Sequence, residues 1–490
     1  MKLKAPAYAR APMRTDTLKR VSNPSDCRCR ARNRQRMRWM WLVLAGLVWV
    51  ASSGRVRSGD LGWEAVPGIL KRIQAPTFPA RDFAITNYGA IGDGQTDCTL
   101  AFAKAIATCH DAGGGRVVVP PGTYLTGAIH LKSRVNLYVS EGATIRFSTD
   151  ARKYLPTVFT RFECTEVMNY SPLIYAFEQQ DIAVTGPGTL DGQGSRSNWW
   201  GWTARAADDV RALVKMGNED VPVAQRVFGE GHFLRPNLLQ PCRCTNVLIE
   251  GVTVKNSPMW TIHPLYCRNV TVRQVTVQGN GPNTDGCDPD SCADVLIEKC
   301  LFNTGDDCIA IKSGRDRDGH RVGLPSENIV IRECVMQNGH GGITCGSETA
   351  GDIRNVFAED CKLNSPNLNM ALRFKTSPER GGVIENVWIR KCVIQSGSKS
   401  GIDMTMNYGW TAGGSRPLPY VPVMRNIEIS DSSFANVPQA IFIEGLSEGA
   451  KISNIRIIGC SFENVTKENT LKFVEGLRLQ GVTINGKPVQ

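Results

Sequence analysis

The chain has 490 residues, of which 42% are hydrophobic and 21% are charged, and its formal net charge is +11. Residues 1–39 contain twelve Lys and Arg and two Asp, so +10 of this charge lies there and the rest of the chain is close to neutral. Because nucleic-acid binding needs a basic face on the folded domain, this distribution argues against a nucleic-acid partner.

The first 54 residues have the pattern of an export leader. The basic stretch is followed by a twelve-residue apolar run, Trp39 to Val50, and then by the small residues Ala51-Ser52-Ser53-Gly54. The run is short for a bilayer span but fits the core of a signal peptide with cleavage after Ser53. Met37 is a second candidate start, and an uncleaved membrane anchor is the alternative. We predict a secreted or periplasmic protein that contacts a membrane only if the leader is uncleaved.

A linker is predicted over residues 55–80 and one folded domain over residues 81–490. Within the domain, Asp97 to Ala112 is the best helix candidate, since a run of three glycines follows it. Its apolar positions are Leu100, Phe102, Ala105 and Ile106. Such a helix would cap the N-terminal end of a solenoid, where unpaired strand edges need covering.

A seven-residue template recurs along the rest of the chain. It opens with Asn or Asp, alternates apolar and polar residues and is rich in Val and Ile, as expected of strands on a half-buried pleated surface. The copies end at Val252, Val275, Cys300, Cys334, Cys361, Cys392, Ser432 and Cys460. Their spacing drifts between 23 and 40 residues, which is typical of a solenoid with loop insertions. The pattern predicts an all-β fold, a single-stranded parallel β-helix, in one long domain.

The 17 cysteines are too few for a dense disulfide scaffold in a chain of this length. Five of them end copies of the template and are predicted to stack as buried thiols, because free Cys packs as a small hydrophobe. Better disulfide candidates are Cys242 with Cys244, and Cys287 with Cys292 and Cys308, with their pairing left open. The six His residues are scattered and no Cys pairs have zinc spacing, so we predict no metal and no cofactor.

Four polar clusters arrive one per coil of the predicted solenoid. They are Asn283-Thr284-Asp285, Gly305-Asp306-Asp307, Gly339-His340-Gly341 and Arg373-Phe374-Lys375. Counted from the last template position of each coil, Asp306 and His340 both fall six residues on, whereas Asp285 falls ten and Arg373 twelve residues on. We therefore expect three carboxylates, an imidazole and two cations to share one face of adjacent coils.

This set of groups suits the hydrolysis of an acidic glycoside. The reaction needs two carboxyl groups in opposite protonation states, and crowding raises the pKa of one so that it keeps its proton. Arg373 and Lys375 point to the same side of a strand and suit a substrate carboxylate. Because Asp306 and Asp307 are adjacent, we expect Gly305 to permit a kink that turns both into the groove.

In this order, the four clusters resemble the motifs of glycoside hydrolase family 28, the polygalacturonases, over about Asp82 to the C-terminus. The resemblance implies a right-handed, pectin-lyase-like β-helix as the catalytic domain and inverting hydrolysis of α-1,4-galacturonosyl bonds. It assigns Asp306 as the general acid, Asp285 and Asp307 as the pair that activates water, and His340 as support for the acid. Inversion implies acid and base carboxyl groups roughly 6.5–9.5 Å apart.

The resemblance also implies a set of substrate-binding residues. Asn283, Arg373 and Lys375 match binding positions in the motifs, and Tyr408 matches a substrate-contacting tyrosine on spacing alone. The stretch from Ser313 to Arg321 looks like that of bacterial exo-acting members. Residues 145–240 would supply loops that close one end of the groove into a pocket, which releases galacturonic acid from chain ends.

The expected partner is pectic polysaccharide or an oligogalacturonate, and the expected state is a monomer, since a capped solenoid has no evident need to associate. Three alternatives stay open: a rhamnogalacturonan or other pectin-backbone hydrolase, a calcium-dependent pectate lyase, and a binding solenoid without catalysis. Outside the motifs, Trp199, Trp200 and Trp202 are interpreted as a packed loop core, and Asp93 as a turn or capping residue.

Overall fold

The computed structural model describes residues 62–409, 419–447 and 449–489. The predicted leader, its cleavage site and the anchor alternative lie outside these residues. Within the described ranges, no helix is both long enough and apolar enough to cross a membrane.

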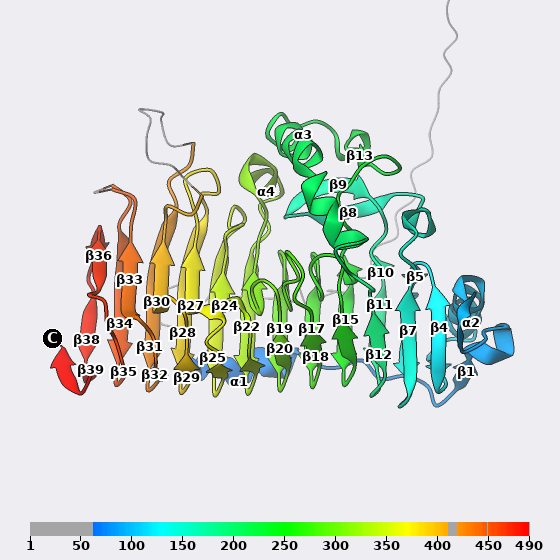
Figure 1. The fold of residues 1–490 in the computed structure, drawn as a ribbon, viewed down its shortest axis with the longest axis horizontal. Helices are drawn as coiled ribbons and strands as arrows, with labels where there is room; N and C mark the ends of the chain where they lie inside the picture. Colours follow the sequence, from blue (N-terminus) through cyan, green and yellow to red (C-terminus); the bar gives the residue numbers. More distant parts are fainter. Residues whose placement is uncertain (1–61, 410–418, 448, 490) are drawn as a thin grey trace, which may run out of the picture. The chain divides into compact units, whose positions relative to one another are not determined.

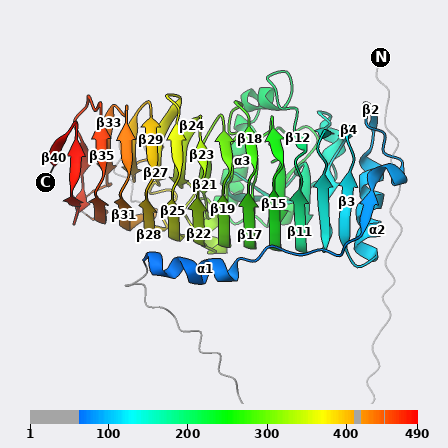
Figure 2. The same cartoon turned by 90° about the horizontal axis from the view of Figure 1, so that it is seen from below.

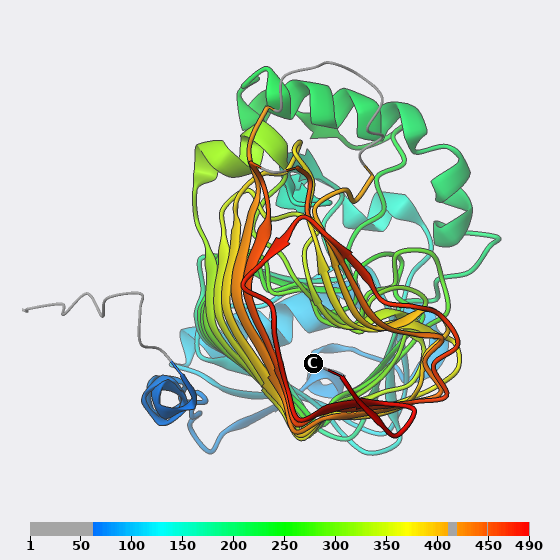
Figure 3. The same ribbon diagram turned by 90° about the vertical axis from the view of Figure 1, so that its left-hand side faces the viewer.

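The described chain winds into a parallel β-helix, which confirms the predicted fold (Figures 1 and 3). Consecutive coils place their strands side by side in two long sheets. The first sheet, called sheet A here, is formed by β1 (Asp82–Ala84), β3 (Gly115–Val119), β6 (Val135–Val139), β11 (Gln180–Thr185), β15 (Thr245–Glu250), β17 (Arg268–Arg273), β19 (Ala293–Glu298), β22 (Ser326–Arg332), β25 (Ile353–Glu359), β28 (Val383–Arg390), β31 (Val423–Ser430), β34 (Ile452–Ile458), β37 (Val474–Glu475) and β38 (Arg478–Gln480). Sheet B is formed by β2 (Asp93–Asp97), β4 (Gly122–Thr126), β7 (Ala143–Phe147), β12 (Thr189–Asp191), β16 (Thr253–Lys255), β18 (Thr276–Gln278), β20 (Leu301–Asn303), β23 (Val335–Met336), β26 (Lys362–Asn364), β29 (Val393–Ser396), β32 (Ser433–Ala435), β35 (Ser461–Glu463), β39 (Val482–Ile484) and β40 (Lys487–Val489).

A third face of the coil carries two shorter sheets. The six-stranded one, sheet C, contains β21 (Ile309–Ile311), β24 (Gly339–Cys345), β27 (Leu368–Lys375), β30 (Ser400–Thr405), β33 (Gln439–Glu444) and β36 (Thr470–Lys472). The three-stranded one contains β5 (Ile129–His130), β10 (Ile174–Phe177) and β14 (Leu239–Cys242). Single bridges through Ile262 and Cys287 join the coils between them.

The template copies are the strands of sheet A, and they stack in register. Val247 pairs with Val270, Val270 with Val295 and Val295 with Ile329, and all four side chains are buried. A slip of one residue would turn this apolar row toward solvent, so the alternating pattern fixes the register.

The Asn or Asp that opens each template copy has a structural reason. Asn246, Asn269 and Asp294 have φ values of 57°, 56° and 58°, in the left-handed region that Asn and Asp tolerate better than most residues. Their amides also bond from coil to coil: Nδ2 of Asn269 donates to Oδ1 of Asn246 over 2.6 Å, and Nδ2 of Asn426 donates to Asn386 over 3.1 Å. These positions form an asparagine ladder that fixes the start of each strand.

All fifteen cysteines within the described residues are buried and unpaired. The thiols of Cys300, Cys334, Cys361 and Cys392 contact one another from coil to coil, as the predicted ladder requires. The disulfide candidates are wrong, because their thiols have other partners. Cys292 accepts a hydrogen bond from the Cys267 backbone, and the thiol of Cys308 donates to the carbonyl of Asn338. The other candidates, Cys242, Cys244 and Cys287, are also unpaired.

Two helices cover the β-helix from outside. The predicted N-terminal helix is α2 (Thr99–Asp111), which buries Phe102, Ala105 and Ile106 at the end of the stack (Figure 1); Leu100, expected on its apolar face, is instead exposed. Within the predicted linker, η1 (Trp63–Ala65) and α1 (Val66–Arg72) lie on the outer face of sheet A (Figure 2). There Val66 and Ile69 of α1 pack in one apolar cluster with residues of sheet A. The described part of the linker is therefore docked on the β-helix.

The remaining helices and the short strands of residues 151–228 lie on the side away from α1 (Figures 1 and 3). They are η3 (Ala151–Tyr154), β8 (Val158–Phe162), β9 (Thr165–Asn169), η4 (Trp199–Ala204), α3 (Ala207–Asn218), η5 (Val223–Gln225), β13 (Val227–Phe228) and α4 (Asp316–Val322). The short helix η2 (Ile85–Tyr88) is an exception, because it contacts α2. Buried ion pairs hold them in place: Arg161 of β8 bonds Asp290 over 2.6 Å, and Arg226 bonds Asp318 of α4 over 2.7 Å. The β8–β9 hairpin is thus fixed beside the coils that carry the polar clusters.

Candidate active site

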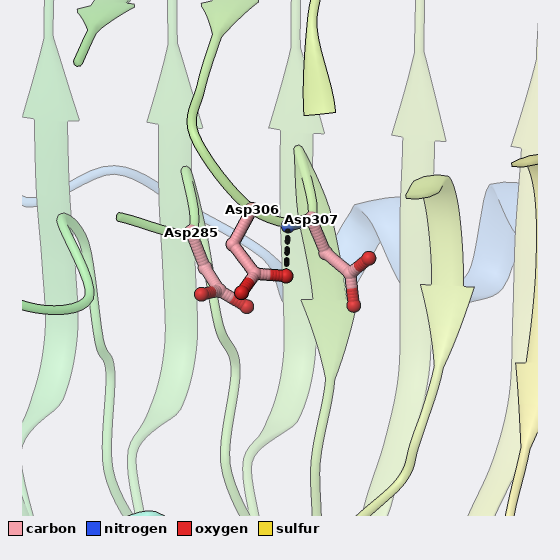
Figure 4. A group of neighbouring side chains, drawn as sticks. All are labelled: Asp285, Asp306 and Asp307. Atoms are coloured by element: carbon pink, nitrogen blue, oxygen red, sulfur yellow. Dashed lines mark hydrogen bonds between the residues drawn. The ribbon is translucent and has the colours of Figure 1, made fainter. Parts of the chain in front are cut away.

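The structure brings the four predicted polar clusters together. Asp285 precedes β19, Asp306 and Asp307 lie between β20 and β21, His340 lies on β24, and Arg373 and Lys375 lie on β27. One carboxylate oxygen from each aspartate lies within 4.8 Å of the others, and Figure 4 shows the three side chains side by side and pointing the same way. The counted register positions therefore identified a true cluster.

Asp306 and Asp307 face the same cluster because the backbone before β21 is a bend and not a strand. The Asp306 carboxylate accepts a hydrogen bond from its neighbour's backbone, Asp307 N, over 2.9 Å (Figure 4). Gly305 permits this bend through close packing and not through a positive φ. A Cβ at this position would lie 2.1 Å from the carbonyl oxygen of Gly281 in the preceding coil, a distance that no side chain allows.

Asp307 is the ionised member of the cluster. Its fully buried carboxylate accepts from Nη1 of Arg373 over 3.1 Å and from Nζ of Lys375 over 2.8 Å. Burial alone would raise the pKa of Asp307, but Lys375, Arg373 and Lys312 outweigh burial and hold the pKa below its ordinary value. Asp307 is therefore a buried carboxylate that stays charged because two cations bind it.

Asp285 has the opposite protonation tendency. Burial raises its pKa well above the ordinary value, and the negative charges of Asp306 and Asp288 raise it further. Its Oδ1 is buried without a hydrogen-bond partner among the described residues. The negative charge of Asp306 therefore opposes ionisation of Asp285.

His340 contacts the member of the cluster that is most open to solvent. Its Nδ1 lies 2.9 Å from Oδ1 of Asp306, and its side chain is 50% exposed. The hydrogen bond to Asp306 is the main cause that raises the pKa of His340 above its ordinary value. As an imidazolium, His340 would donate to Asp306, which agrees with its predicted supporting role.

The predicted substrate-binding residues border the same space. The Tyr408 ring is 40% exposed, and its centroid lies 5.2 Å from the Arg373 guanidinium and 4.9 Å from the Lys375 ammonium. Asn283 has a φ of 56°, and its Oδ1 accepts from Nη2 of Arg235 over 2.7 Å. Arg235 was not among the predicted site residues, and its hydrogen bond orients the side chain of Asn283.

A pocket of about 210 Å³ opens beside the carboxylates. Its lining residues are Glu163, Trp260, Asn283, Asp285, Asp306, Lys312, Arg315, Ser347, Glu348, Lys375, Arg380 and Tyr408. Ion pairs join its walls: Arg315 bonds Glu163 at the tip of the β8–β9 hairpin over 2.6 Å, and Lys312 bonds Glu348 over 3.1 Å. Sequence reasoning missed Glu163, Lys312, Glu348 and Arg380, because they lie in connections between template strands and carry no periodic signal.

The distance between the carboxyl groups differs from the expectation. An inverting mechanism predicts acid and base roughly 6.5–9.5 Å apart, whereas the nearest oxygens of the three aspartates lie within 4.8 Å of one another. The close approach is possible because Arg373 and Lys375 neutralise Asp307. Carboxyl spacing alone therefore does not assign the stereochemical course in this protein.

Three close carboxylates can also hold a metal ion. Here Asp307 already bonds two cationic side chains, and Lys312 faces the same cluster. Cationic side chains thus supply the compensation that a metal would give. We retain the expectation of no metal, which activity in excess chelator tests.

Two further sequence interpretations concern residues outside the cluster. Trp199 is 1% exposed, and its ring packs against Trp202 at 4.9 Å between centroids, while Nε1 of Trp200 donates to Ser257 O; the three belong to a packed loop. Oδ1 of Asp93 accepts from the backbone of Gln95 and Thr96, as a turn residue does.

The chain is similar to known proteins over most of its length. The family model described as "Glycosyl hydrolases family 28" matches residues 228–482, and one described as "Rhamnogalacturonase A/epimerase, pectate lyase-like" matches residues 83–150. A "Probable polygalacturonase" of Vitis vinifera is 31% identical over 85% of this chain and 81% of its own length. An "Exo-poly-alpha-D-galacturonosidase" of Dickeya chrysanthemi is 27% identical over 83% of this chain and 74% of its own length.

Among solved structures, an exopolygalacturonase from Thermotoga maritima is 40% identical. It covers 87% of this chain and 97% of its own chain, with a TM-score of 0.83. A polygalacturonase from Erwinia carotovora is 23% identical with a TM-score of 0.59, which supports the fold alone. The right-handed parallel β-helix is therefore shared with solved relatives.

Proposed function

The chain belongs to glycoside hydrolase family 28, and from this premise we propose that it hydrolyses the α-1,4-galacturonosyl bonds of pectin and polygalacturonate from chain ends, with inversion, releasing galacturonic acid. The observation that carries the proposal is the contact between the carboxylate cluster and two cations, Asp307 with Arg373 and Lys375. Acid–base chemistry on a sugar and recognition of a sugar carboxylate thus lie at one place.

The proposed general acid is Asp306. It lies at the solvent-facing edge of the cluster beside His340, where a glycosidic oxygen can reach it. The proposed roles place the acid on Asp306 and the activation of water on Asp285 together with the ionised Asp307. His340 donates to Asp306 and stabilises its carboxylate after proton transfer.

The proposed water lies between Asp285 and Asp307. Two hydrogen bonds of about 2.7 Å can bridge oxygens that are separated by less than 5 Å, so one water fits the short gap. Attack by this water on the face opposite to the leaving oxygen would invert the anomeric carbon. Inversion is therefore proposed from the assigned roles, while the carboxyl spacing by itself would also suit retention.

Arg373 and Lys375 are proposed to bind the substrate carboxylate, and Tyr408 packs against both cations. A guanidinium offers a planar fork and an ammonium a point charge, which together favour a uronate over a neutral sugar. Asn283, held by Arg235, lines the same pocket and is proposed to bind a sugar hydroxyl.

Action from chain ends is supported by the pocket walls. The β8–β9 hairpin tip, in residues 145–240 as expected, places Glu163 against Arg315, and Trp260 lines the same pocket. This wall leaves room for few sugars on its side of the catalytic carboxylates. A bound polysaccharide chain can therefore extend only on the opposite side, away from the wall. The first soluble product is then a monomer.

The experiment is a time course of products from oligogalacturonates of defined length, resolved by mass. The wild type is expected to release galacturonic acid from the start, and Asp306→Asn to lose about 10²- to 10⁴-fold in rate, the usual contribution of a general acid. Asp93→Asn, in an exposed turn, is the matched control and should keep full activity. Mixed oligomers at early times would refute action from chain ends, and an unaffected Asp306→Asn would refute its role.

A rhamnogalacturonan hydrolase is the second candidate, because the second family model matches residues 83–150. That match covers the cap and first coils, not the catalytic cluster. Turnover of rhamnogalacturonan faster than polygalacturonate would favour it. An unsaturated product that absorbs in the ultraviolet, with activity lost in chelator, would instead favour a lyase.

We also propose that the protein is exported and acts as a monomer on pectic polysaccharide outside the cytoplasm. The support is the leader pattern of residues 1–54 and the polymeric nature of the substrate, which does not enter cells intact. N-terminal sequencing of the protein recovered outside the cytoplasm is expected to begin near Gly54. Light scattering that shows a dimer would contradict the monomer.

A further inference from the structure

Lys312 and Glu348 form a buried ion pair in the floor of the active-site pocket that the assigned chemistry does not use. Nζ of Lys312 lies 3.1 Å from Oε2 of Glu348 and 4.9 Å from the Trp260 ring centroid. The two side chains are 5% and 10% exposed, and both line the pocket with Asp285 and Asp306. Burying such a pair costs desolvation of two charges, so a functional reason is expected.

The fold places Lys312 on the same outward row as Lys375. Ile311 of β21 pairs with Cys345 of β24, which pairs with Phe374 of β27. Lys312 and Gly346 directly follow β21 and β24, and Lys375 is the last residue of β27, so in this register Gly346 lies between the two lysines. Lys375 bonds Asp307 directly, and Lys312 lines the pocket together with Asp285 and Asp306.

Four carboxyl groups act on the charge of Lys312, and Asp306 and Lys375 line the same pocket. Glu348 faces Lys312 from the connection after β24, Asp285 and Asp288 from the coil before, and Asp307 from its own coil. Asp290, which forms a β-bridge with Lys312, belongs to a buried group with His263 and Arg161. The charges of Arg380, Arg315 and Lys375 also act on Glu348.

In the part of the chain that the structure describes, Asp288 is a buried carboxyl group next to Lys312 that has no other compensating contact. Both oxygens of its fully buried carboxyl lack a hydrogen-bond partner within the described residues. Burial raises the pKa of Asp288 well above its ordinary value, and Lys312 is the main opposing charge. Lys312 acts in the same direction on Asp285 and Asp307.

We propose that Lys312 is a positioning residue that sets how many protons the carboxylates of the catalytic cluster hold, and that Glu348 limits the strength of its charge. Lys312 favours the ionised form of Asp285, which the water-activating role needs. Glu348 partly cancels this cation, so that the cluster still retains the one proton that the general acid needs. This inference rests on the proposed hydrolysis and adds a residue to it.

The proposal predicts opposite effects of two substitutions on the pH dependence of kcat/KM. Lys312→Met removes a cation, raises the carboxyl pKa values and should move the acidic limb upward by about 1 pH unit, the low end for a charge a few ångströms away. Glu348→Gln leaves Lys312 uncompensated and should move the limb downward. Lys362→Met, at an exposed lysine of β26, is the matched control and should not move it. The carboxylates of the substrate titrate equally in all four proteins.

Other roles predict other results. If Lys312 only binds substrate, Lys312→Met raises KM and leaves the acidic limb in place, which would overturn the proposal. If the pair is only structural, both variants lose activity and thermal stability without moving the limb, which would also overturn it. If Lys312→Met does not fold, Glu348→Gln alone must move the limb downward, and an unmoved limb refutes the proposal.

A readout without turnover separates this inference from the proposed function. The C=O stretching band of protonated carboxyl groups is measured by difference infrared spectroscopy across pH, with Lys312→Met compared with the wild type. The variant is expected to keep a protonated carboxyl at pH values where the wild type has lost it. An unchanged band overturns the inference even if the wild type cleaves galacturonan, whereas a shifted band in a protein that cleaves none refutes the proposed function alone.

Discussion

At the scale of single residues, the site depends on how neighbouring charges divide protons among buried carboxyl groups. Asp285 and Asp307 are equally buried, yet their pKa values move in opposite directions. The difference is the direct contact of Asp307 with Arg373 and Lys375, which Asp285 lacks. Burial alone would have neutralised both groups, so the strand that carries the two cations decides which carboxylate stays ionised.

His340 supplies a prediction about pH at this scale. Its bond to Asp306 raises its pKa, so a two-dimensional NMR titration should give a value above the ordinary figure of about 6.5. In Asp306→Asn the value should fall, because the partner charge is gone. A raised pKa means that the pair stabilises the fold at low pH and that this contribution is lost as pH rises through the folded-state pKa.

His130 is the internal control for this titration. Burial lowers its pKa, and its ring bonds the Ser171 hydroxyl over 3.0 Å, not Asp306. Its midpoint should lie below that of His340 and should not respond to Asp306→Asn. A His340 midpoint that is unchanged by the substitution would contradict the assigned pair.

At the scale of elements, an Asn or Asp opens each template copy, and a buried cysteine ends five of the eight copies. The asparagine ladder begins the strands of sheet A, and the buried cysteines end them. Both features follow from sequence, because Asn tolerates a positive φ and Cys fits a small buried site. The ladders set the register that places Asp285, Asp306, His340 and Arg373 on four successive coils.

Asn355 tests the ladder. It has a φ of 56°, donates to Asn328 over 3.2 Å and accepts from Asn386 over 3.4 Å. Asn355→Ala should destabilise the β-helix by about 2 kcal/mol, from the strain of a left-handed Ala and lost hydrogen bonds. Asn355→Gly loses the same bonds without that strain and should cost about 1 kcal/mol less. Denaturant unfolding measures both, and an Ala variant as stable as the Gly variant would contradict this account.

The helix α1 tests a second element. Ile69 is 3% exposed in the cluster with Phe357 and Trp388, so Ile69→Ala should weaken docking by about 2 kcal/mol or more. Because α1 lies outside the solenoid, the effect should be local. Hydrogen exchange over residues 66–80 should accelerate while that of sheet A does not. Lys71→Ala, at an exposed position of the same helix, is the control, and equal exchange in both variants would contradict the docking.

The sequence predicted the architecture and the catalytic cluster, because both follow from a repeat. Asp306 and His340 fall six residues after the same template position, so their register follows by counting. The positions of the pocket-wall residues could not be found by counting from the template. These residues, Glu163, Lys312, Glu348 and Arg380, lie in connections of unequal length. The disulfide candidates failed because nearness in sequence does not bring thiols together when a coil stacks each thiol on the next coil. The short carboxyl spacing depends on cations from a later coil.

At the scale of the whole described solenoid, the function is assembled from coils that contact only their neighbours. The coils preceding β19, β21, β24 and β27 each supply one part of the cluster, and the β8–β9 hairpin supplies the wall. The residues that catalyse the reaction and the residues that limit how much of the substrate chain can bind thus lie in different parts of the sequence. The family resemblance accounts for the first, and residues 145–240 account for the proposed action from chain ends.

The most direct test of the central claim is anomer-resolved proton NMR of the first products released from a defined oligogalacturonate. The account predicts galacturonic acid that is initially the β-anomer, formed from an α-linkage, with this signal lost in Asp306→Asn and kept in Asp93→Asn. Initial α-anomer would contradict inversion and agree instead with the short carboxyl spacing. Larger oligomers as first products would contradict the closed pocket.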